Sequence, residues 1–407
     1  MELEPLYKRV VGLDVHQAQI TACAILQEDD GTSRVEHRQF GSFKRDRRAL
    51  AEWVVEVGAQ EVIMESTGIY WKSPYAALEA VGIQAKVVNA RHVKTVPGRK
   101  TDIGDAQWLA ILGRSGLLRG SFIPPARFRD LRMLSRQRQK LTSQLSSEKN
   151  RLNKVLTDAG IRLGVVVSDL HGKAARAMTK GLIAGEPPEL VVTYAGNRLQ
   201  ASQEEILDAL QGDLNDVNRF ILRELVANIE ATEAQIERFD RKLLSELKPE
   251  SGLLDLLETM PGVERIGAAM LLVEIGTDMG VFGSADRLAS WVAVCPGNHE
   301  SAGKRTSGRI RQGNRHVRRL LVEFAQAASR TRSALRQKFD SLLPRRGYKR
   351  AIIALGHKIL RIIYRLLERR EPYRDSAMDY EAIHVQRNAP RWLKALIKHG
   401  YITPATA

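Results

Sequence analysis

Along the first 120 residues, short β-branched apolar runs alternate with stretches whose apolar residues recur every three or four positions. Short apolar runs bounded by turn residues predict strands, and the wider spacing predicts amphipathic helices. The expected strands are Arg9–Val15, Ile20–Leu26, Arg34–Phe40, Glu61–Ser66 and Ala85–Asn89, and the expected helices are Arg45–Val57, Trp71–Val81 and one ending near Gly116. The predicted order is therefore three hairpin-like strands followed by helices and strands in alternation.

This element order is typical of an α/β sheet of the ribonuclease-H-like kind. In that arrangement the centre of the first strand lies beside the end of the fourth. Asp14 interrupts the first apolar run, at a position where a buried strand should carry another apolar residue, and Glu65 lies at the end of the fourth strand. Because an unpaired buried carboxylate is costly, a partner such as a cation is expected near Asp14.

Two further acids lie in the segment R-K-T-D-I-G-D-A, at the start of the expected third helix. Asp102 and Asp105 are three residues apart, a spacing that places both on one helical face, and Lys100 precedes them. Together with Asp14 and Glu65 they offer four oxygen donors, a set that suits Mg²⁺. Two such ions about 4 Å apart would clamp the oxygens of a phosphoryl transfer. The structural alternative makes Asp102 a helix N-cap and Asp105 an ordinary first-turn acid.

Two long amphipathic stretches occupy the middle of the chain. Leucines recur at intervals of three, four and seven from Phe128 to Leu156, and a similar apolar stripe runs from Val217 to Leu247. Such stripes predict a long helical hairpin or an inter-subunit coiled coil, and a core stripe within one subunit is the alternative. The intervening residues, about 160–216, give weak signals.

The segment Leu253–Gly276 reads as a helix, a Pro-Gly turn and a second helix. This pattern resembles a helix-hairpin-helix element, whose backbone N–H groups can hold a nucleic-acid phosphate. A plain helical corner without a ligand is the alternative.

A polar loop rich in glycine, serine and cations follows within Trp291–Asn314. Small residues let a backbone approach a phosphate closely, and the cations of the loop and the next helix would neutralise it: Lys304, Arg305, Arg309, Arg311 and Arg315. Ser301 and Ser307 are candidate nucleophiles, and His299 and Glu300 stand beside Ser301 as possible bases. The alternative is a solvated connection in which both serines are bystanders.

The charge distribution points to a nucleic-acid partner. The chain of 407 residues carries 63 Lys and Arg against 47 Asp and Glu, a net charge of +16. Residues 304–370 alone hold 20 basic and 3 acidic residues, so the surplus lies in the C-terminal third, where amphipathic helices are expected. A basic region of this kind is the electrostatic footprint of nucleic-acid binding. A membrane surface fits less well, because the aromatic anchors expected there are sparse.

Other features of the composition restrict the class of protein. No apolar run reaches the ~18 residues of a membrane span, and the N-terminus lacks the profile of a signal peptide. The two cysteines, Cys23 and Cys295, lie in apolar settings and exclude a zinc site built on cysteine. These features lead us to expect a cytoplasmic protein with reduced thiols.

Taken together, the motifs resemble those of one known family over nearly the whole chain. The front of the chain contributes V-G-L-D-V-H, M-E-S-T-G-I-Y-W and K-T-D-I-G-D-A, and the back contributes P-G-V-E-R-I-G-A and G-N-H-E-S-A-G-K-R-T-S-G-R-I-R-Q-G-N. In these segments the chain is similar to the DEDD transposases of the insertion sequence 110 family, which are RNA-guided "bridge" recombinases of mobile elements.

The resemblance implies a domain plan. It places a RuvC-like metal-binding domain at residues 1–125 and a coiled-coil region at 126–250. A mainly α-helical transposase domain would follow at 251–375, with a peripheral tail at 376–407. Its implied partners are the DNA of the element ends and target, a guide RNA, and further copies of the chain, as a dimer or as a tetramer in the synaptic complex.

The resemblance also implies roles for individual residues. Asp14, Glu65, Asp102 and Asp105 would hold Mg²⁺, and Ser301 is the best match to the family's nucleophilic serine, while Ser307 fits a less constrained part of the pattern. The serine would form a covalent phosphoserine with one DNA strand, which the hydroxyl of a second strand then resolves. Guide RNA would choose the target by base pairing.

Two other functions remain open from the sequence. The first is a RuvC-like nuclease or Holliday-junction resolvase, which would hydrolyse DNA with the four acids alone. The second is a scaffold that binds nucleic acid without catalysis, in which the acids are structural.

Overall fold

A computed structural model gives the fold and describes residues 5–66, 68–90, 93, 104–196, 199–295, 299–301, 304–307, 310, 312–375 and 380–402. The chain divides into two compact units, Met1–Ala126 and Arg127–Ala407, which we call the N-terminal and C-terminal units. Four of the predicted site residues, Lys100, Asp102, Arg309 and Arg311, lie outside the described residues.

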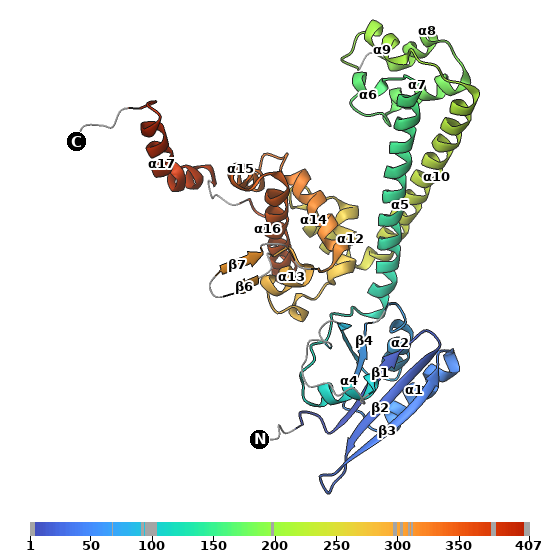
Figure 1. The fold of residues 1–407 in the computed structure, drawn as a ribbon, viewed down its shortest axis with the longest axis vertical. Helices are drawn as coiled ribbons and strands as arrows, with labels where there is room; N and C mark the ends of the chain where they lie inside the picture. Colours follow the sequence, from blue (N-terminus) through green and yellow to red (C-terminus); the bar gives the residue numbers. More distant parts are fainter. Residues whose placement is uncertain are drawn as a thin grey trace, which may run out of the picture. The chain divides into compact units, whose positions relative to one another are not determined.

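The N-terminal unit is built on a five-stranded mixed sheet (Figure 1). Its strands are β1 Arg9–Val15, β2 Gln19–Gln27, β3 Ser33–Gly41, β4 Glu61–Glu65 and β5 Lys86–Val88. They lie in the order β3-β2-β1-β4-β5, with the first three antiparallel and β4 and β5 parallel to β1. All five predicted strands are confirmed, and the predicted neighbourhood of the first and fourth strands is correct.

Helices cover both faces of this sheet because each buried strand is apolar on both sides. The helices are α1 Lys44–Glu56, α2 Lys72–Ala80 and α4 Asp105–Arg114. Val11 and Leu13 pack with residues of α1 and α2, whereas Val10 and Ile63 pack with residues of α4. Successive strand residues point to opposite faces, so this division follows from the alternation along β1 and β4.

Gly12 explains how closely α4 approaches the sheet. A Cβ atom at this position would overlap the carbonyl oxygen of Ala106 and lie 2.7 Å from the backbone nitrogen of Ala110. Gly113, near the other end of α4, is packed against the side chains of Ile63 and Val10. The helix therefore rests on β1 at Gly12, and only a residue without a side chain fits there.

The C-terminal unit begins with the long helix α5, Ala126–Asp158, which is paired with α10, Asp216–Glu246 (Figure 1). Ion pairs join the two helices at Arg138–Asp240 (2.6 Å) and Lys149–Glu233 (2.8 Å). The predicted helical hairpin is thus present within one chain. Val217, the first residue of the predicted second stripe, was wrongly assigned to the apolar face, because its side chain is 65% exposed.

The residues that gave weak sequence signals form a small helical cluster between α5 and α10. Its elements are α6 Leu163–Val166, α7 Lys173–Ala184, α8 Pro188–Val191, a 3₁₀ turn Val192–Ala195 and α9 Gln203–Leu210. Their apolar side chains, including Met178 and Leu210, pack with Leu156 of α5 and Leu222 of α10. Several of these helices are only four to eight residues long, which is too short for a clear periodic pattern.

The rest of the C-terminal unit is mainly helical. It contains α11 Ser251–Glu258, α12 Arg265–Ile275, α13 Ala285–Val292, the strands β6 His299–Ser301 and β7 Lys304–Ser307, α14 Arg315–Ala328, α15 Ala334–Arg346, α16 Tyr348–Arg369 and α17 Tyr380–Lys398. Short 3₁₀ turns at Lys248–Glu250 and Met279–Val281 join neighbouring helices. None of the described helices is long and apolar enough to cross a bilayer.

The Pro-Gly turn between α11 and α12 packs inside this unit. Gly262 has a positive φ of 85°, and a Cβ atom there would lie 2.5 Å from the backbone nitrogen of Ala328 and 2.7 Å from the carbonyl oxygen of Phe324. The turn is therefore closed against the last turn of α14. This contact favours the plain helical corner over a turn that presents its backbone to a phosphate.

Candidate active site

The carboxylates of Asp14 and Glu65 are placed at the same end of the sheet by strand register. β1 and β4 run parallel, with Gly12 opposite Ile63 and Leu13 opposite Met64. Continuing this register by one residue sets Asp14 opposite Glu65, and the alternation along both strands turns these residues toward the face covered by α4. Both side chains are half-buried.

Asp105 reaches the same end of the sheet because of the direction of α4. Ala106 near the start of the helix lies at Gly12, and Gly113 near its end lies at Val10, so α4 runs opposite to β1. Its first residue, Asp105, is exposed and comes next to the carboxyl ends of β1 and β4. The N-cap is Gly104, so the alternative that Asp102 caps this helix is wrong.

The described carboxylates do not form a complete metal cage. Among the residues that the structure describes, no three His, Cys, Asp or Glu side chains are grouped closely enough to hold a metal ion. Asp14 accepts a hydrogen bond from Nε2 of His16 at 3.0 Å, and this imidazole is 59% exposed. The donors are hard carboxylate oxygens of the kind that Mg²⁺ takes, and the predicted fourth ligand, Asp102, lies outside the described residues.

The two candidate nucleophiles lie on a two-stranded hairpin where the sequence predicted a loop. β6 and β7 are antiparallel, and their register places Ser301 opposite Lys304 and His299 opposite Ser307, with an irregularity after His299. Arg305, another predicted phosphate ligand, is opposite Glu300. Both serines therefore remain candidates, one on each strand.

The chain segments on either side of this hairpin meet at its base. Ala293, which follows α13, has a positive φ of 59°, rare for a residue with a side chain. A Cβ atom on Gly313 would lie 2.6 Å from both the Cβ of Ala293 and the carbonyl oxygen of Val292. Residues 293 and 313 are thus in close contact, and the segment that carries the hairpin begins and ends at this contact.

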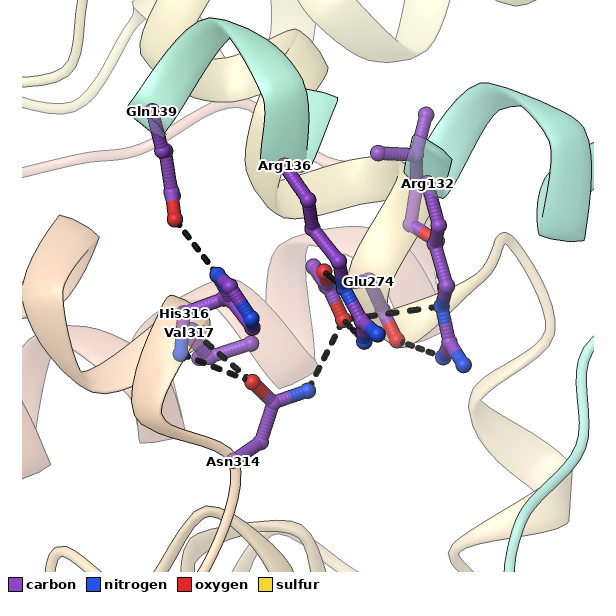
Figure 2. A network of polar contacts seen from close by, with 8 residues as sticks. Arg132, Arg136, Gln139, Glu274, Asn314, His316 and Val317 are labelled. Carbon is purple, nitrogen blue, oxygen red and sulfur yellow. Dashed lines mark hydrogen bonds and ion pairs between the residues drawn. The ribbon is translucent and has the colours of Figure 1, made fainter. Parts of the chain in front are cut away.

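Asn314, which follows this contact, is hydrogen-bonded to a buried ionic network that the sequence analysis missed (Figure 2). Glu274 of α12 is fully buried, and its carboxylate accepts two hydrogen bonds from Arg136 of α5, at 2.7 and 2.9 Å. Arg132, one turn earlier on α5, lies 3.5 Å from the same carboxylate and donates to the backbone carbonyls of Val273 and Glu274. The bidentate Arg136 contact is the strongest geometry for such a pair.

Asn314 links this network to the start of α14. Its Nδ2 donates to Glu274 at 2.8 Å, while its Oδ1 caps α14 by accepting from the backbone nitrogens of His316 and Val317. The Nδ1 of His316 and the Oε1 of Gln139 on α5 are 2.6 Å apart. Asn314 directly follows Gly313, so the chain that leaves the hairpin is fixed to α12. Through Glu274 and Gln139 it is also fixed to α5 (Figure 2).

The charges of this network set the protonation states within it. Burial alone would raise the pKa of Glu274, but hydrogen bonding from Arg136, the charges of both arginines and the Asn314 amide hold that pKa below its ordinary value. Burial lowers the pKa of Arg132 to about 10, with the charge of Glu274 opposing the shift. Burial and the charge of Arg136 lower the pKa of His316. At neutral pH the network therefore contains an ionised acid, two arginines and a neutral imidazole that donates to Gln139.

A signal for this network was present in the sequence. Glu274 is the single charged residue in the apolar helix A-A-M-L-L-V-E-I, and Arg132 and Arg136 are spaced by one helical turn. A carboxylate buried among apolar residues requires cationic partners. The sequence did not reveal which of its many arginines would supply them.

Comparison with known proteins identifies the family of the chain. The sequence model of the DEDD transposases of insertion sequence 110 matches residues 11–161. A second model, for transposases of the IS116/IS110/IS902 family, matches residues 254–340. The two matched segments include the sheet with its acids and the hairpin with its serines.

Full-length relatives agree with these matches. A probable family 20 transposase of Pseudomonas aeruginosa is 25% identical over 322 residues, which cover 77% of this chain and 85% of the relative. The transposase of insertion sequence element IS1111A of Coxiella burnetii is 24% identical over 91% of this chain and 92% of its own. Among solved structures, RuvC of Thermus thermophilus aligns with 28% of this chain and 99% of its own, at 12% identity and a TM-score of 0.22. The chain belongs to the insertion sequence 110 family of transposases.

Proposed function

We propose that this transposase cuts and rejoins DNA by phosphoryl transfer, using the acids of the N-terminal unit and a serine of the hairpin. The proposal is supported by the parallel register of β1 and β4, which sets Asp14 beside Glu65, and by the packing of α4 on Gly12, which starts the helix of Asp105 at the same end of the sheet. Acids that face the same end of a sheet repel one another unless a cation lies between them.

A divalent cation would remove that repulsion. Asp14, Glu65, Asp102 and Asp105 are the residues that would hold it, and Mg²⁺ is the ion that their oxygen donors fit best. When bound, it would supply Lewis-acid polarisation of the scissile phosphate. The partial exposure of Asp14 and Glu65 and the exposure of Asp105 leave these carboxylates accessible to a DNA phosphate.

Ser301 is the nucleophile that we propose. Its Oγ would form a bond to phosphorus as one ester bond of the DNA strand breaks, and the departing strand oxygen would take up a proton. In the second step the hydroxyl of another strand attacks the same phosphorus, and the serine regains its proton. Bond energy is conserved in the phosphoserine ester, so rejoining needs no nucleotide cofactor. Lys304 is opposite Ser301 in the backbone register of the hairpin, and its positive charge would favour binding of the reacting phosphate.

Recognition of the target would rest on a guide RNA that pairs with DNA, while the protein holds the backbones of both. The supporting observation is the concentration of cations in residues 304–370, with 20 basic and 3 acidic residues. This density of charge exceeds what a helical domain needs for its own folding. It suits contacts with many phosphates, and we expect binding to weaken steeply as salt is raised.

The test is to capture the covalent intermediate. The full-length chain is incubated with Mg²⁺ and end-labelled DNA of its element ends, and protein-linked DNA is sought by denaturing gel and by mass spectrometry of the attached peptide. We expect nucleotide on Ser301 and no adduct with Ser301→Ala, while Ser307→Ala is the matched control from the same hairpin. Adduct on Ser307 alone would reassign the nucleophile.

The acids are tested in the same reaction. Asp105→Asn should abolish the adduct while leaving DNA binding intact, because it removes a ligand from an exposed helix start. Glu56→Gln, an exposed acid on α1 at the other face of the sheet, is the control and should react normally. Metal-dependent cleavage with no protein-linked DNA would instead favour a nuclease that hydrolyses DNA with its acids alone.

A further inference from the structure

A groove between α15 and α16 of the C-terminal unit is not part of the candidate active site. Residues 371–374 also line it, and its volume is about 270 Å³. This volume is close to the lower end of the ~300–1,000 Å³ found for small-ligand sites. All of the residues that line it belong to the described part of the chain, and Figure 1 shows the two helices that form it lying side by side.

The lining of this α15–α16 groove is strongly cationic. It contains five positive side chains and one acid, Glu371; the cations are Lys338, Lys358, Arg365, Arg369 and Arg374. Lys338 and Lys358 are half-buried, whereas the three arginines and Glu371 are exposed at the rim. The lining of the groove therefore has four more positive than negative side chains.

Two neighbouring cations outside the groove are paired with acids. Arg361 of α16 lies 3.4 Å from Asp286, and Arg336 of α15 lies 3.5 Å from Asp340. Within the described residues, neither Arg365 nor Arg369 makes an ion pair. These two rim arginines are therefore available to an anionic ligand.

The arrangement along α16 suits a chain of anions. Lys358, Arg365 and Arg369 occupy positions i, i+7 and i+11, which lie on one face of the helix. At 1.5 Å per residue the row spans about 16 Å. A single phosphate would meet one or two of these cations, whereas a nucleic-acid backbone would meet them in succession.

The groove also has an apolar floor, which a backbone alone would not use. Leu335 of α15, Ile362 and Leu366 of α16, and Tyr373 all line it. Tyr373 is held in place at two points: its hydroxyl donates to Asp375 at 2.7 Å, and its backbone nitrogen donates to the hydroxyl of Thr259 at 2.9 Å. A fixed aromatic ring beside cations is the usual platform on which an unpaired base stacks.

We propose that the α15–α16 groove binds an unpaired nucleotide of a DNA or RNA strand, with its base against Tyr373 and the adjoining phosphates along Lys358, Arg365 and Arg369. A duplex presents its phosphates outward and keeps its bases stacked inside, so it cannot fill the apolar end of the groove. The proposal rests on the nucleic-acid binding proposed above for residues 304–370, but it does not depend on the serine or the metal.

Binding of short oligonucleotides to the full-length chain tests this site. Fluorescence anisotropy is measured with a labelled 12-nucleotide single strand of DNA, the same strand as RNA, and the blunt DNA duplex. The groove variant is Arg365→Ala/Arg369→Ala, and both side chains are exposed, so the fold should survive. The matched control is Lys349→Ala/Arg350→Ala, two exposed cations on the same helix that do not line the groove.

We expect the groove variant to weaken binding of a single strand and to reduce the slope of log affinity against log salt by about 1.4, the value for two lost phosphate contacts. Tyr373→Leu should weaken binding of the single strand by a further ~5- to 150-fold through lost stacking. The control and the duplex should change little. A loss confined to DNA or to RNA identifies the strand that uses the groove. Equal losses in the groove and control variants, or a duplex weakened as much as the single strands, would overturn the proposal.

Discussion

The buried network around Glu274 permits a quantitative prediction. Glu274→Ala removes the carboxylate that faces Arg132 and Arg136 and leaves both guanidinium groups without their acid. Arg132 is only 12% exposed, so water cannot replace the lost partner, and Asn314 loses the acceptor of its side-chain amide. Breaking a buried ion pair on one side typically costs 3–5 kcal/mol, since an uncompensated charge remains. Domain stability is about 5–15 kcal/mol, so the loss is a large fraction of the total.

The exchange of backbone amide hydrogens, followed by mass spectrometry of peptides from α12 and α14, measures this effect locally. A cost of 3–5 kcal/mol should accelerate exchange about 150- to 5,000-fold at those amides whose exchange requires this unit to open. Glu323→Gln is the matched control: Glu323 pairs with Arg319 on the exposed face of α14, and its loss should cost less than about 1 kcal/mol.

A triple variant separates charge burial from simple loss of contacts. Arg132→Met, Arg136→Met and Glu274→Leu together replace the ionic group with apolar side chains, and such replacements are often neutral or stabilising. We expect the triple variant to be more stable than Glu274→Ala alone. A Glu274→Ala cost below about 1 kcal/mol, or a triple variant less stable than the single one, would refute the reasoning.

Two other predictions concern packing and pH. Gly12→Ala should destabilise the N-terminal unit by about 3 kcal/mol or more, because the new Cβ would overlap the Ala106 carbonyl, whereas Gly104→Ala, which has open space, should change the melting temperature little. The folded-state pKa of His316 is lowered from 6.5 and that of Glu274 from 4.5, so each group stabilises the fold above those values and loses that contribution as pH falls below them. Urea unfolding at a series of pH values should therefore show stability falling below pH 6.5 and again below pH 4.5. His316→Gln should remove part of the first loss, and stability that rises on acidification would contradict the assignment.

The sequence determined much of the N-terminal unit. Its buried strands β1, β2 and β4 are mainly apolar runs and its helices are amphipathic, so local pattern and final structure agree at these elements. Asp14 and Glu65 could be paired from the element order alone, because strand register is fixed once the buried runs are aligned. The sequence did not determine the position of Asp105, because that position depends on the direction in which α4 crosses β1 at Gly12.

Tertiary structure decided the features that depend on contacts between distant segments. The Pro-Gly turn at Gly262 resembled a phosphate-binding corner, and only the structure shows that Gly262 packs against the backbone of α14. Glu274 could be recognised as an unusual buried acid, but its partners lie about 140 residues away on α5, and many arginines were equally plausible by sequence. The α15–α16 groove likewise arises because two helices and residues 371–374 come together. Periodicity reports which side of an element is buried, whereas the identity of the surface that buries it is set by the packing of the whole chain.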